Sequence, residues 1–377
     1  MLKRLLCVLV AMTFFGCSSD NRTAVLRPFR LFDPAVDTSL SQPTQFAVNG
    51  CDLYVYDRGS EKIVRLNSNS QPFRYGSSGS GPGELRHLFA LSARSDGVVF
   101  GVDWVRGRLL SWSQTGESQG DIPLTHHVPR HSFVGPIVAL LDGTILDAPW
   151  GGRALGLRVD AQTMDSAHLI YQIDSQGVVR NSWGSVRPAF PEQAGLARAL
   201  YSSGDIVLLG DTIVYLKFAE PVLEFFALRS GGREPVRHVE LPRLRVGLPA
   251  VSQGIVKRGE TTETFRTRAI DVSATSLAAF GNDLLAITLR HADTPKENRG
   301  PAEGAWAKEQ LIVLKRDGTR VATYELDGRE TRSSAFLRDG SFVRLYFADS
   351  TGGGDRVLGI YQIPTIRASR RDSSSCL

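Results

Sequence analysis

Cysteine, histidine and long apolar runs are scarce in this chain of 377 residues, which has 4 cysteines and 7 histidines. It contains no Cys-x-x-Cys pair, no His-Glu-x-x-His motif, no Gly-x-Ser-x-Gly elbow and no aspartate-rich calcium loop. The common signatures of zinc, calcium and serine-hydrolase chemistry are therefore missing. No apolar run approaches the roughly 20 residues that a membrane-spanning helix needs. Helical periodicity is confined to one short stretch at 192–200. We expect an all-β protein without a cofactor.

The N-terminus follows the pattern of a bacterial export signal. A basic start at residues 3–4 precedes an apolar run over residues 5–15, which is too short to cross a bilayer. Gly16 and Cys17 end this run. Residues 14–17 resemble the lipobox of bacterial lipoproteins, in which the cysteine is lipidated and the signal is cut just before it. That family usually has Leu where this chain has Phe14. We predict a signal over residues 1–16 with lipidation of Cys17; plain secretion with a free Cys17 is the alternative.

Charge of one sign is not concentrated anywhere in the chain. The formal net charge is +5, and loss of residues 1–16 lowers it to +3 because Lys3 and Arg4 leave and that segment has no acidic residue. A nucleic-acid binder would show a clustered basic stripe, so nucleic acid is not an expected partner. If Cys17 is lipidated, Cys51 and Cys376 are the cysteines that could pair, and the sequence does not decide whether they do.

A repeated unit organises the chain. Residues 51–57 form a β-rich run that ends in Asp57, and a second β-rich run follows after a polar turn. Residues 96–103 repeat this arrangement and end in Asp103, which is 46 residues further on. A period of about 40–50 residues, made only of short strands and turns, is typical of β-propellers.

Tight-turn pairs mark six such units. Their residues tolerate a positive φ, which two-residue strand reversals require. The pairs are Asn49-Gly50, Asp96-Gly97, Asp142-Gly143, Gly210-Asp211, Asn282-Asp283 and Asp339-Gly340. We therefore predict a six-bladed β-propeller over residues 17–364, followed by a flexible Ser/Arg-rich tail at 365–377.

The ends and the spacing of the units yield two further expectations. The sixth unit lacks an outer strand, while the apolar run from Val25 to Phe32 has no blade of its own. Because open sheet edges invite aggregation, we predict that Val25–Phe32 closes the ring as the missing strand of blade six. Insertions are expected around 151–167, in a long connector at 243–268, and at 291–308. Long loops on a rigid scaffold are where binding residues concentrate, although each loop can equally be a solvated connection.

The segment from Tyr75 to Leu85 resembles the blade-to-blade connector of NHL-repeat proteins and related bacterial six-bladed propellers. Its Gly81-Pro82-Gly83-Glu84 core suits a type II turn, in which proline fixes φ and glycine takes the positive φ. The resemblance is good over residues 74–116, moderate over 43–70, and elsewhere limited to the strand pattern. It implies the fold. Some members of this group are metal-dependent lyases or lactonase-like hydrolases, but no blade here has a matching histidine or acidic motif.

Two groups of residues are candidate sites. His126, His127 and His131 are the densest histidine group, and His126 and His131 are weak candidates for a metal site; an exposed polar loop is the simpler interpretation. Arginines also precede or begin five of the six predicted inner strands, namely Arg86, Arg130, Arg198, Arg268 and Arg332. Guanidinium groups suit carboxylates and phosphates, so these could bind anions at the mouth of the channel. The chain has 37 arginines and 7 lysines, however, and chance alone would place arginine in most loops.

The function expected from these patterns is a non-enzymatic binding or scaffold propeller, held in the cell envelope through its lipid on the periplasmic side or the outer surface. Its ligand would be a protein, peptide, glycan or anionic molecule, and the lipid would be its contact with the membrane. The alternative is a hydrolase or lyase of the lactonase-like type acting at the central channel. That activity would need converging acids or histidines where the inner strands begin.

Overall fold

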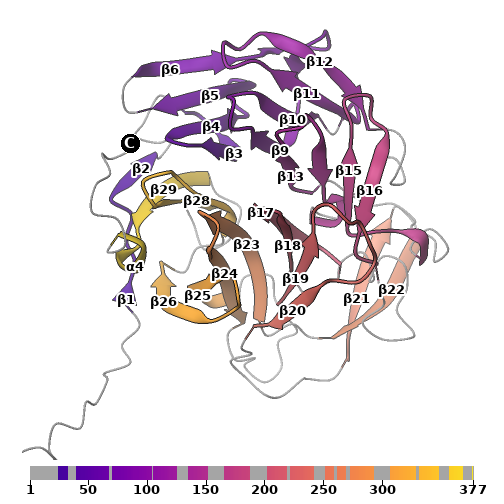
Figure 1. Cartoon of the computed structure of the whole chain (residues 1–377), viewed down its shortest axis with the longest axis vertical. Coiled ribbons are helices and arrows are strands. Elements are labelled where there is room, and N and C mark those ends of the chain that lie inside the picture. The colour runs from indigo at the N-terminus through magenta and orange to yellow at the C-terminus, as the bar shows by residue number, and fades with distance from the viewer. Residues whose placement is uncertain are drawn as a thin grey trace, which may run out of the picture.

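The computed structural model describes residues 24–32, 40–67, 70–103, 105–124, 135–151, 165–186, 202–218, 221–241, 251–258, 261–268, 272–292, 306–327, 331–347, 356–367 and 376. Within these residues, six sheets of four or five mainly antiparallel strands stand around a central axis (Figure 1). This arrangement confirms the predicted six-bladed propeller. Among the described residues, no helix is both long enough and apolar enough to cross a membrane.

Each blade contains four strands that follow one another from the axis outward. Blade one has β3 (Pro43–Asn49), β4 (Asp52–Asp57), β5 (Lys62–Asn67) and β6 (Ser70–Tyr75). Blade two has β9 (Leu88–Ala93), β10 (Val99–Asp103), β11 (Arg108–Trp112) and β12 (Ser118–Pro123). Blade three has β13 (Ile137–Ala139), β14 (Ile145–Asp147), β15 (Ile170–Ile173) and β16 (Val179–Trp183).

The second half of the ring repeats the pattern. Blade four has β17 (Gly204–Leu209), β18 (Thr212–Lys217), β19 (Val222–Ala227) and β20 (Arg237–Glu240). Blade five has β23 (Val272–Phe280), β24 (Leu284–Ala292), β25 (Trp306–Lys315) and β26 (Arg320–Leu326). Blade six has β27 (Thr331–Phe336), β28 (Ser341–Phe347) and β29 (Arg356–Gln362), and its fourth strand comes from the other end of the chain.

The turns between first and second strands lie where the tight-turn pairs predict them. Gly97 and Gly340, for example, have φ angles of +88° and +86°, a region in which a side chain is strained. Gly340 also has no room for a side chain, because a Cβ there would lie 2.8 Å from Cγ2 of Ile366.

Ring closure follows the prediction and extends it. β2 (Arg30–Phe32) pairs with β29 in antiparallel register and completes blade six. The preceding β1 (Ala24–Val25) pairs in parallel with β26 and adds a fifth strand to blade five. Between the two strands, the side chain of Leu26 is buried among residues of blades five and six. The N-terminal segment therefore joins two neighbouring blades.

A disulfide makes a second closure. Cys51, in the first turn of blade one, bonds to Cys376 near the C-terminus, with 4.8 Å between the Cα atoms. The backbone N–H of Cys376 donates to Asp339 in the first turn of blade six, at 2.8 Å. Of the segment predicted as a flexible tail, the structure describes residues 365–367 and Cys376. Residues 365–367 belong to α4 (Pro364–Arg367), whose Ile366 is buried.

The core is divided into six clusters, each held between two adjacent blades. Between blades one and two, for instance, Tyr54 and Tyr75 pack with Leu110 and Trp112. Each blade is thus buried on both faces by its neighbours, and none has a core of its own. Stability depends on the complete ring, because an open ring would expose two apolar sheet faces to water.

The connector predicted at 243–268 contains an additional hairpin, β21 (Val251–Arg258) paired with β22 (Thr261–Arg268). The threonine-rich sequence of this segment favours strands. The sequence analysis had predicted only a polar connector there. In Figure 1 the hairpin lies at the rim of the ring. Part of the insertion predicted at 291–308 is also strand, because β24 and β25 extend into it from both sides. The short helix considered at 192–200 lies outside the described residues.

Candidate functional site on the connector face

One side of the propeller, here called the connector face, is where the first strand of each blade begins and the second strand ends. The register of the paired strands defines it through Pro43–Asp57, Leu88–Asp103, Ile137–Asp147, Gly204–Lys217, Val272–His291 and Thr331–Tyr346. Every connection that enters a first strand or leaves a second strand has an end on this face.

Most of the long connections have both ends on the connector face. They comprise residues 33–42, 76–87, 124–136, 148–169, 184–203, 241–271, 293–305 and 348–355. On the opposite face, the turns between first and second strands contain at most five residues, and so do those between third and fourth strands except the nine-residue turn 228–236 of blade four. Because short turns preserve the scaffold while long connections can vary in sequence and shape, the connector face is the candidate functional surface.

Aspartates at the ends of two second strands hold the neighbouring loops of this face in place through hydrogen bonds and an ion pair. The carboxylate of Asp57 accepts hydrogen bonds from the backbone N–H of Ser41 (3.1 Å) and Gln42 (2.5 Å) and from the hydroxyl of Ser60 (2.6 Å). Burial acts to raise the pKa of Asp57, but these hydrogen bonds outweigh it and hold the pKa below its usual value. An acid stabilised in its ionised form suits a structural joint and is a poor proton donor.

Asp103 has the corresponding position in blade two and holds the glycine-rich connector through Arg106. The Arg106 guanidinium lies 3.7 Å from the Asp103 carboxylate and donates to the carbonyl oxygens of Gly79, Gly81 and Glu84. One cation therefore satisfies three carbonyls of a segment that has little regular structure.

The predicted type II turn is present in the same connector. The N–H of Glu84 donates to the carbonyl of Gly81 at 3.2 Å, and Gly83 has a φ of +71°. The indole N–H of Trp112 donates to the Gly83 carbonyl at 3.3 Å. A Cβ at Gly83 would lie 2.5 Å from Cβ of Ser118. The segment that resembles NHL connectors is therefore a joint between blades one and two.

Two of the five predicted arginines can be placed with their side chains. Arg86 is exposed and precedes β9 on the connector face. Arg332 is the second residue of β27, is half-buried, and has its guanidinium 4.8 Å from the ring centroid of Phe347. Both therefore lie near the beginnings of inner strands. Arg268 is the last residue of β22, and the position of its side chain is outside the description.

The remaining predicted site residues, Cys17, His126, His131, Arg130 and Arg198, lie outside the described residues. Within the part of the chain that the structure describes, no group of three or more His, Cys, Asp or Glu side chains is arranged to hold a metal ion.

A buried ionic network between blades five and six was missed by the sequence analysis. The guanidinium of Arg344, in β28, donates to Glu309 of β25, to Asp327 and to the hydroxyl of Tyr361. Its Nε donates to Oγ1 of Thr331 at 2.5 Å. Burial opposes the charge of Arg344, but Glu309, Tyr361 and Asp327 together outweigh this effect, so the pKa of Arg344 is raised. The sequence feature that could have revealed this network is Arg344 itself, a single charged residue inside the largely apolar run 341–347.

Glu309 connects this network to the inner strands. Its carboxylate accepts from the backbone N–H of Thr331 at 3.0 Å and from the hydroxyl of Thr275 at 3.1 Å. Further inward, the hydroxyls of Ser276 and Ser334 join the first strands of blades five and six at 2.8 Å. All of these polar groups have partners within the protein, so the network fixes the seam between two blades.

Asp205 is a second buried acid that the sequence analysis missed. It lies in β17, the inner strand of blade four, and Oδ2 accepts from the N–H of Leu277 in blade five at 2.9 Å. Oδ1 accepts from the N–H of Ile206, also at 2.9 Å. The residue keeps some exposed surface, but burial around the carboxylate raises its pKa to about 6. Asp205 is thus an acid with a raised pKa close to the axis, and it accepts hydrogen bonds from the backbone of two blades.

Comparison with known proteins identifies the fold but no family. No family model and no curated protein matches the chain. A member of the DUF4221 family from Bacteroides vulgatus has 12% sequence identity and a TM-score of 0.53, covering 90% of this chain and 98% of that chain. The "Putative exported protein" of Bacteroides fragilis has 10% identity and a TM-score of 0.50, covering 90% and 94%. A streptogramin B lyase has 13% identity and a TM-score of 0.44, covering 89% and 97%. At these identities the likeness to the first two structures shows the propeller fold alone.

Proposed function

We propose that this chain is an extracytoplasmic binding or scaffold propeller, anchored by a lipid on Cys17, that engages its ligand on the connector face. The observation that carries the proposal is topological: all but one of the connections longer than five residues have both ends on that face, and the opposite face has short turns apart from residues 228–236. A scaffold that keeps its variable segments on one side presents a single recognition surface.

The extracytoplasmic location is supported by the Cys51–Cys376 disulfide, because disulfides persist in oxidising compartments and are rare in the cytosol. The signal-like residues 1–16 agree with export. A structural neighbour that is named as an exported protein points the same way.

An anionic ligand is the class that the arginines of the connector face favour. Arg58 and Arg86 are both exposed there, and Arg332 and Arg356 lie 4.8 and 5.5 Å from the ring of Phe347. Guanidinium groups recognise carboxylates and phosphates through paired hydrogen bonds. The contribution of such exposed groups weakens as salt is added.

Photo-cross-linking in cells tests which face binds. A photoreactive amino acid is placed at Arg58 or Arg86 on the connector face and, as matched controls, at the exposed turn residues Leu141 or Asn282 on the opposite face. We expect discrete adducts from the first pair and none from the second. Adducts that form only from Leu141 or Asn282 would contradict the assignment of the binding face.

Lipidation is tested separately by Cys17→Ala, which we expect to move the protein from the membrane fraction to the soluble fraction. The reason is that the acyl chains would be the covalent attachment to the bilayer. Mass spectrometry of the mature N-terminus provides the second measurement. An unacylated N-terminus at another residue would reject the anchor.

A further inference from the structure

An apolar and cationic surface lies on the outer rim of blades five and six, and we call it the strap surface. It consists of Val25, Arg27, Phe29, Arg30 and Leu31 on the segment that closes the ring. The side chains of Val25, Phe29 and Leu31 are 57%, 48% and 48% exposed. These three large apolar side chains are exposed within one segment of seven residues, whereas the other exposed large apolar side chains of the described residues stand singly along the chain.

The apolar exposure of the strap surface is not needed for closing the ring. Leu26 and Phe32 are the strap residues that enter the core, where they are 6% and 3% exposed. The main chain supplies the remaining attachment, since the N–H of Leu26 donates to Glu325 and that of Phe29 to Ile360, both at 2.9 Å. Polar side chains at positions 25, 29 and 31 would serve closure equally well.

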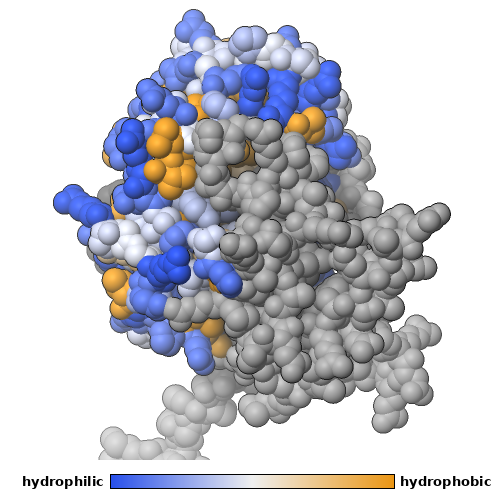
Figure 2. Space-filling model, turned by 90° about the vertical axis from the view of Figure 1, so that its right-hand side faces the viewer, coloured by the Kyte–Doolittle hydropathy of each residue, from blue (hydrophilic) through white to orange (hydrophobic). Residues whose placement is uncertain are grey.

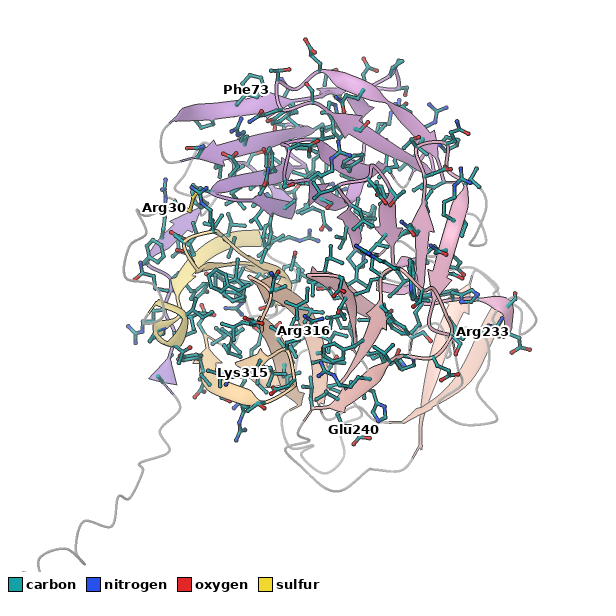
Figure 3. All side chains as sticks on the ribbon, viewed as in Figure 1. Arg30, Phe73, Arg233, Glu240, Lys315 and Arg316 are labelled. Carbon is teal, nitrogen blue, oxygen red and sulfur yellow. A yellow bond between two sulfur atoms is a disulfide. The ribbon has the colours of Figure 1, made fainter. Side chains whose placement is uncertain are left out.

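Charge accompanies the apolar groups. Residues 24–32 contain Arg27 and Arg30, both exposed, and no acidic residue. Figure 3 shows Arg30 at the outer rim of blade six, away from the axis. Arginines beside exposed aromatic and aliphatic side chains are the composition of surfaces that lie in the headgroup region of an anionic bilayer.

The position of the strap surface in the chain identifies its occupant. Seven residue steps separate Cys17 from Ala24, and even fully extended they span at most about 25 Å. If Cys17 carries a lipid, the rim that contains β1 and β2 is therefore the part of the described propeller held nearest to the membrane. In Figure 1, β1 and β2 lie along the outer edge of blades five and six.

We infer that the strap surface docks on an anionic phospholipid bilayer, so that the propeller stands against the membrane on the rim of blades five and six. This inference rests on the proposed lipid anchor. Docking would orient the molecule with its rim on the bilayer, leaving the connector face accessible from the side and fixing its height above the membrane.

Nitroxide-lipid quenching tests the inference on the full chain. The protein is purified from the membrane fraction and reconstituted in vesicles of phosphatidylethanolamine and phosphatidylglycerol. Phe29→Trp introduces a reporter on the strap surface, and Val236→Trp is the matched control, because Val236 is 69% exposed in a turn of blade four. We expect the added fluorescence of Phe29→Trp to be quenched at least about threefold more strongly than that of Val236→Trp. Equal quenching of the two tryptophans would overturn the inference that the strap surface docks on the bilayer.

Charge and alternative occupants are tested with the same protein. Arg27→Gln together with Arg30→Gln is expected to reduce quenching in vesicles that contain phosphatidylglycerol and to have little effect in phosphatidylethanolamine alone. No effect in either would reject the choice of anionic lipid. A photoreactive group at Phe29 that forms adducts with a protein in cells, and none with lipid, would overturn membrane docking in favour of a protein partner.

Failure of the anchor and failure of the strap surface give different results. In one outcome, the wild-type protein is not acylated but sediments with added anionic vesicles, and the double variant Phe29→Ser with Leu31→Ser does not sediment. The proposed lipid anchor is then wrong, while docking of the strap surface is supported. The matched control is Leu141→Ser with Val178→Ser, which removes two exposed apolar side chains of blade three. If the protein is acylated and quenching at the two reporters is equal, the anchor stands and the strap surface is wrong.

Discussion

At the scale of single residues, several charged groups with buried carboxylates or guanidiniums lie at the seams between blades. Asp205 links the inner strands of blades four and five, and Arg344 with Glu309 links blades five and six. Each of these groups has partners from the neighbouring blade or from its own backbone. Their energetic effects differ, because Asp205 is a lone acid whereas Arg344 and Glu309 neutralise each other.

Asp205 should make stability depend on pH. Its pKa in the folded protein is about 6, above the value of about 4 in an unfolded chain. The stabilisation it provides is therefore complete below about pH 4 and is lost as the pH rises through 6. The difference corresponds to about 2–3 kcal/mol. Urea unfolding of the wild type and Asp205→Asn between pH 4.5 and 7.5 measures it.

We expect the stability of Asp205→Asn to rise relative to the wild type as the pH increases over this range. Asp283→Asn is the control, because Asp283 is an exposed acid in a turn of blade five, and its difference from the wild type should stay constant. Parallel stability curves for the wild type and Asp205→Asn would show that Asp205 does not titrate in this window.

Removal of one partner from the buried ion pair should be much more harmful than removal of both. Glu309→Gln leaves the fully buried Arg344 with a reduced counter-charge, and we expect a loss of about 3–5 kcal/mol in the free energy of unfolding. The double variant Glu309→Leu with Arg344→Met removes both charges and should be clearly more stable than Glu309→Gln. Chemical denaturation of the three proteins provides the comparison. A double variant less stable than Glu309→Gln would mean that the pair itself stabilises the seam.

At the scale of elements, the sequence predicted what local chemistry determines. Turn pairs such as Asp96-Gly97 reverse the chain because glycine accepts a positive φ, and Gly81 to Glu84 form a type II turn for the same reason. Pairings between distant segments were harder to predict. The parallel pairing of β1 with blade five depends on where β26 lies in the finished ring. The two residues of β1 form no sequence pattern that could specify this pairing.

The candidate site shows the same division. The connector face could be inferred from turn lengths, whereas Asp205 and Arg344 were not identified, because a charge inside a strand can point either to solvent or to a neighbouring blade. Tertiary packing decides between these outcomes, and a single sequence does not contain it. Arg86 and Arg332 lie near the beginnings of inner strands on the connector face. Anion binding by these two arginines stays a prediction.

Deletion of residues 24–33 should destabilise the whole domain. It removes the outer strand of blade six and the buried side chains of Leu26 and Phe32 from two inter-blade cores. Because each blade is buried by its neighbours, we expect one cooperative transition lowered by many degrees, measured by calorimetry. Replacement of residues 251–268 by a flexible linker is the control, since β21 and β22 pair only with each other among the described strands. An unchanged melting curve after the first deletion would reject the closure role.

At the scale of the whole molecule, two independent closures meet blade six. The strand β2 completes its sheet from the N-terminal side, and the Cys51–Cys376 disulfide ties the C-terminal end to blade one (Figure 3). The described surface in Figure 2 is mostly hydrophilic, with apolar residues in small separate groups. The molecule therefore buries most of its apolar groups between blades, and its integrity depends on the seams.

The disulfide should stabilise the ring mainly by restricting the unfolded chain, because it joins residues that are 325 positions apart. We expect Cys376→Ser to lower the free energy of unfolding by about 2–5 kcal/mol while leaving a single transition. In a reducing agent the wild type should fall to the stability of the variant, and Cys376→Ser itself should not change. If reduction leaves the wild-type transition in place, the disulfide makes no net contribution and closure depends on β2 alone. If Cys376→Ser instead splits the transition in two, blade one separates from blade six before the rest of the ring unfolds, and the seam between them is the weakest in the molecule.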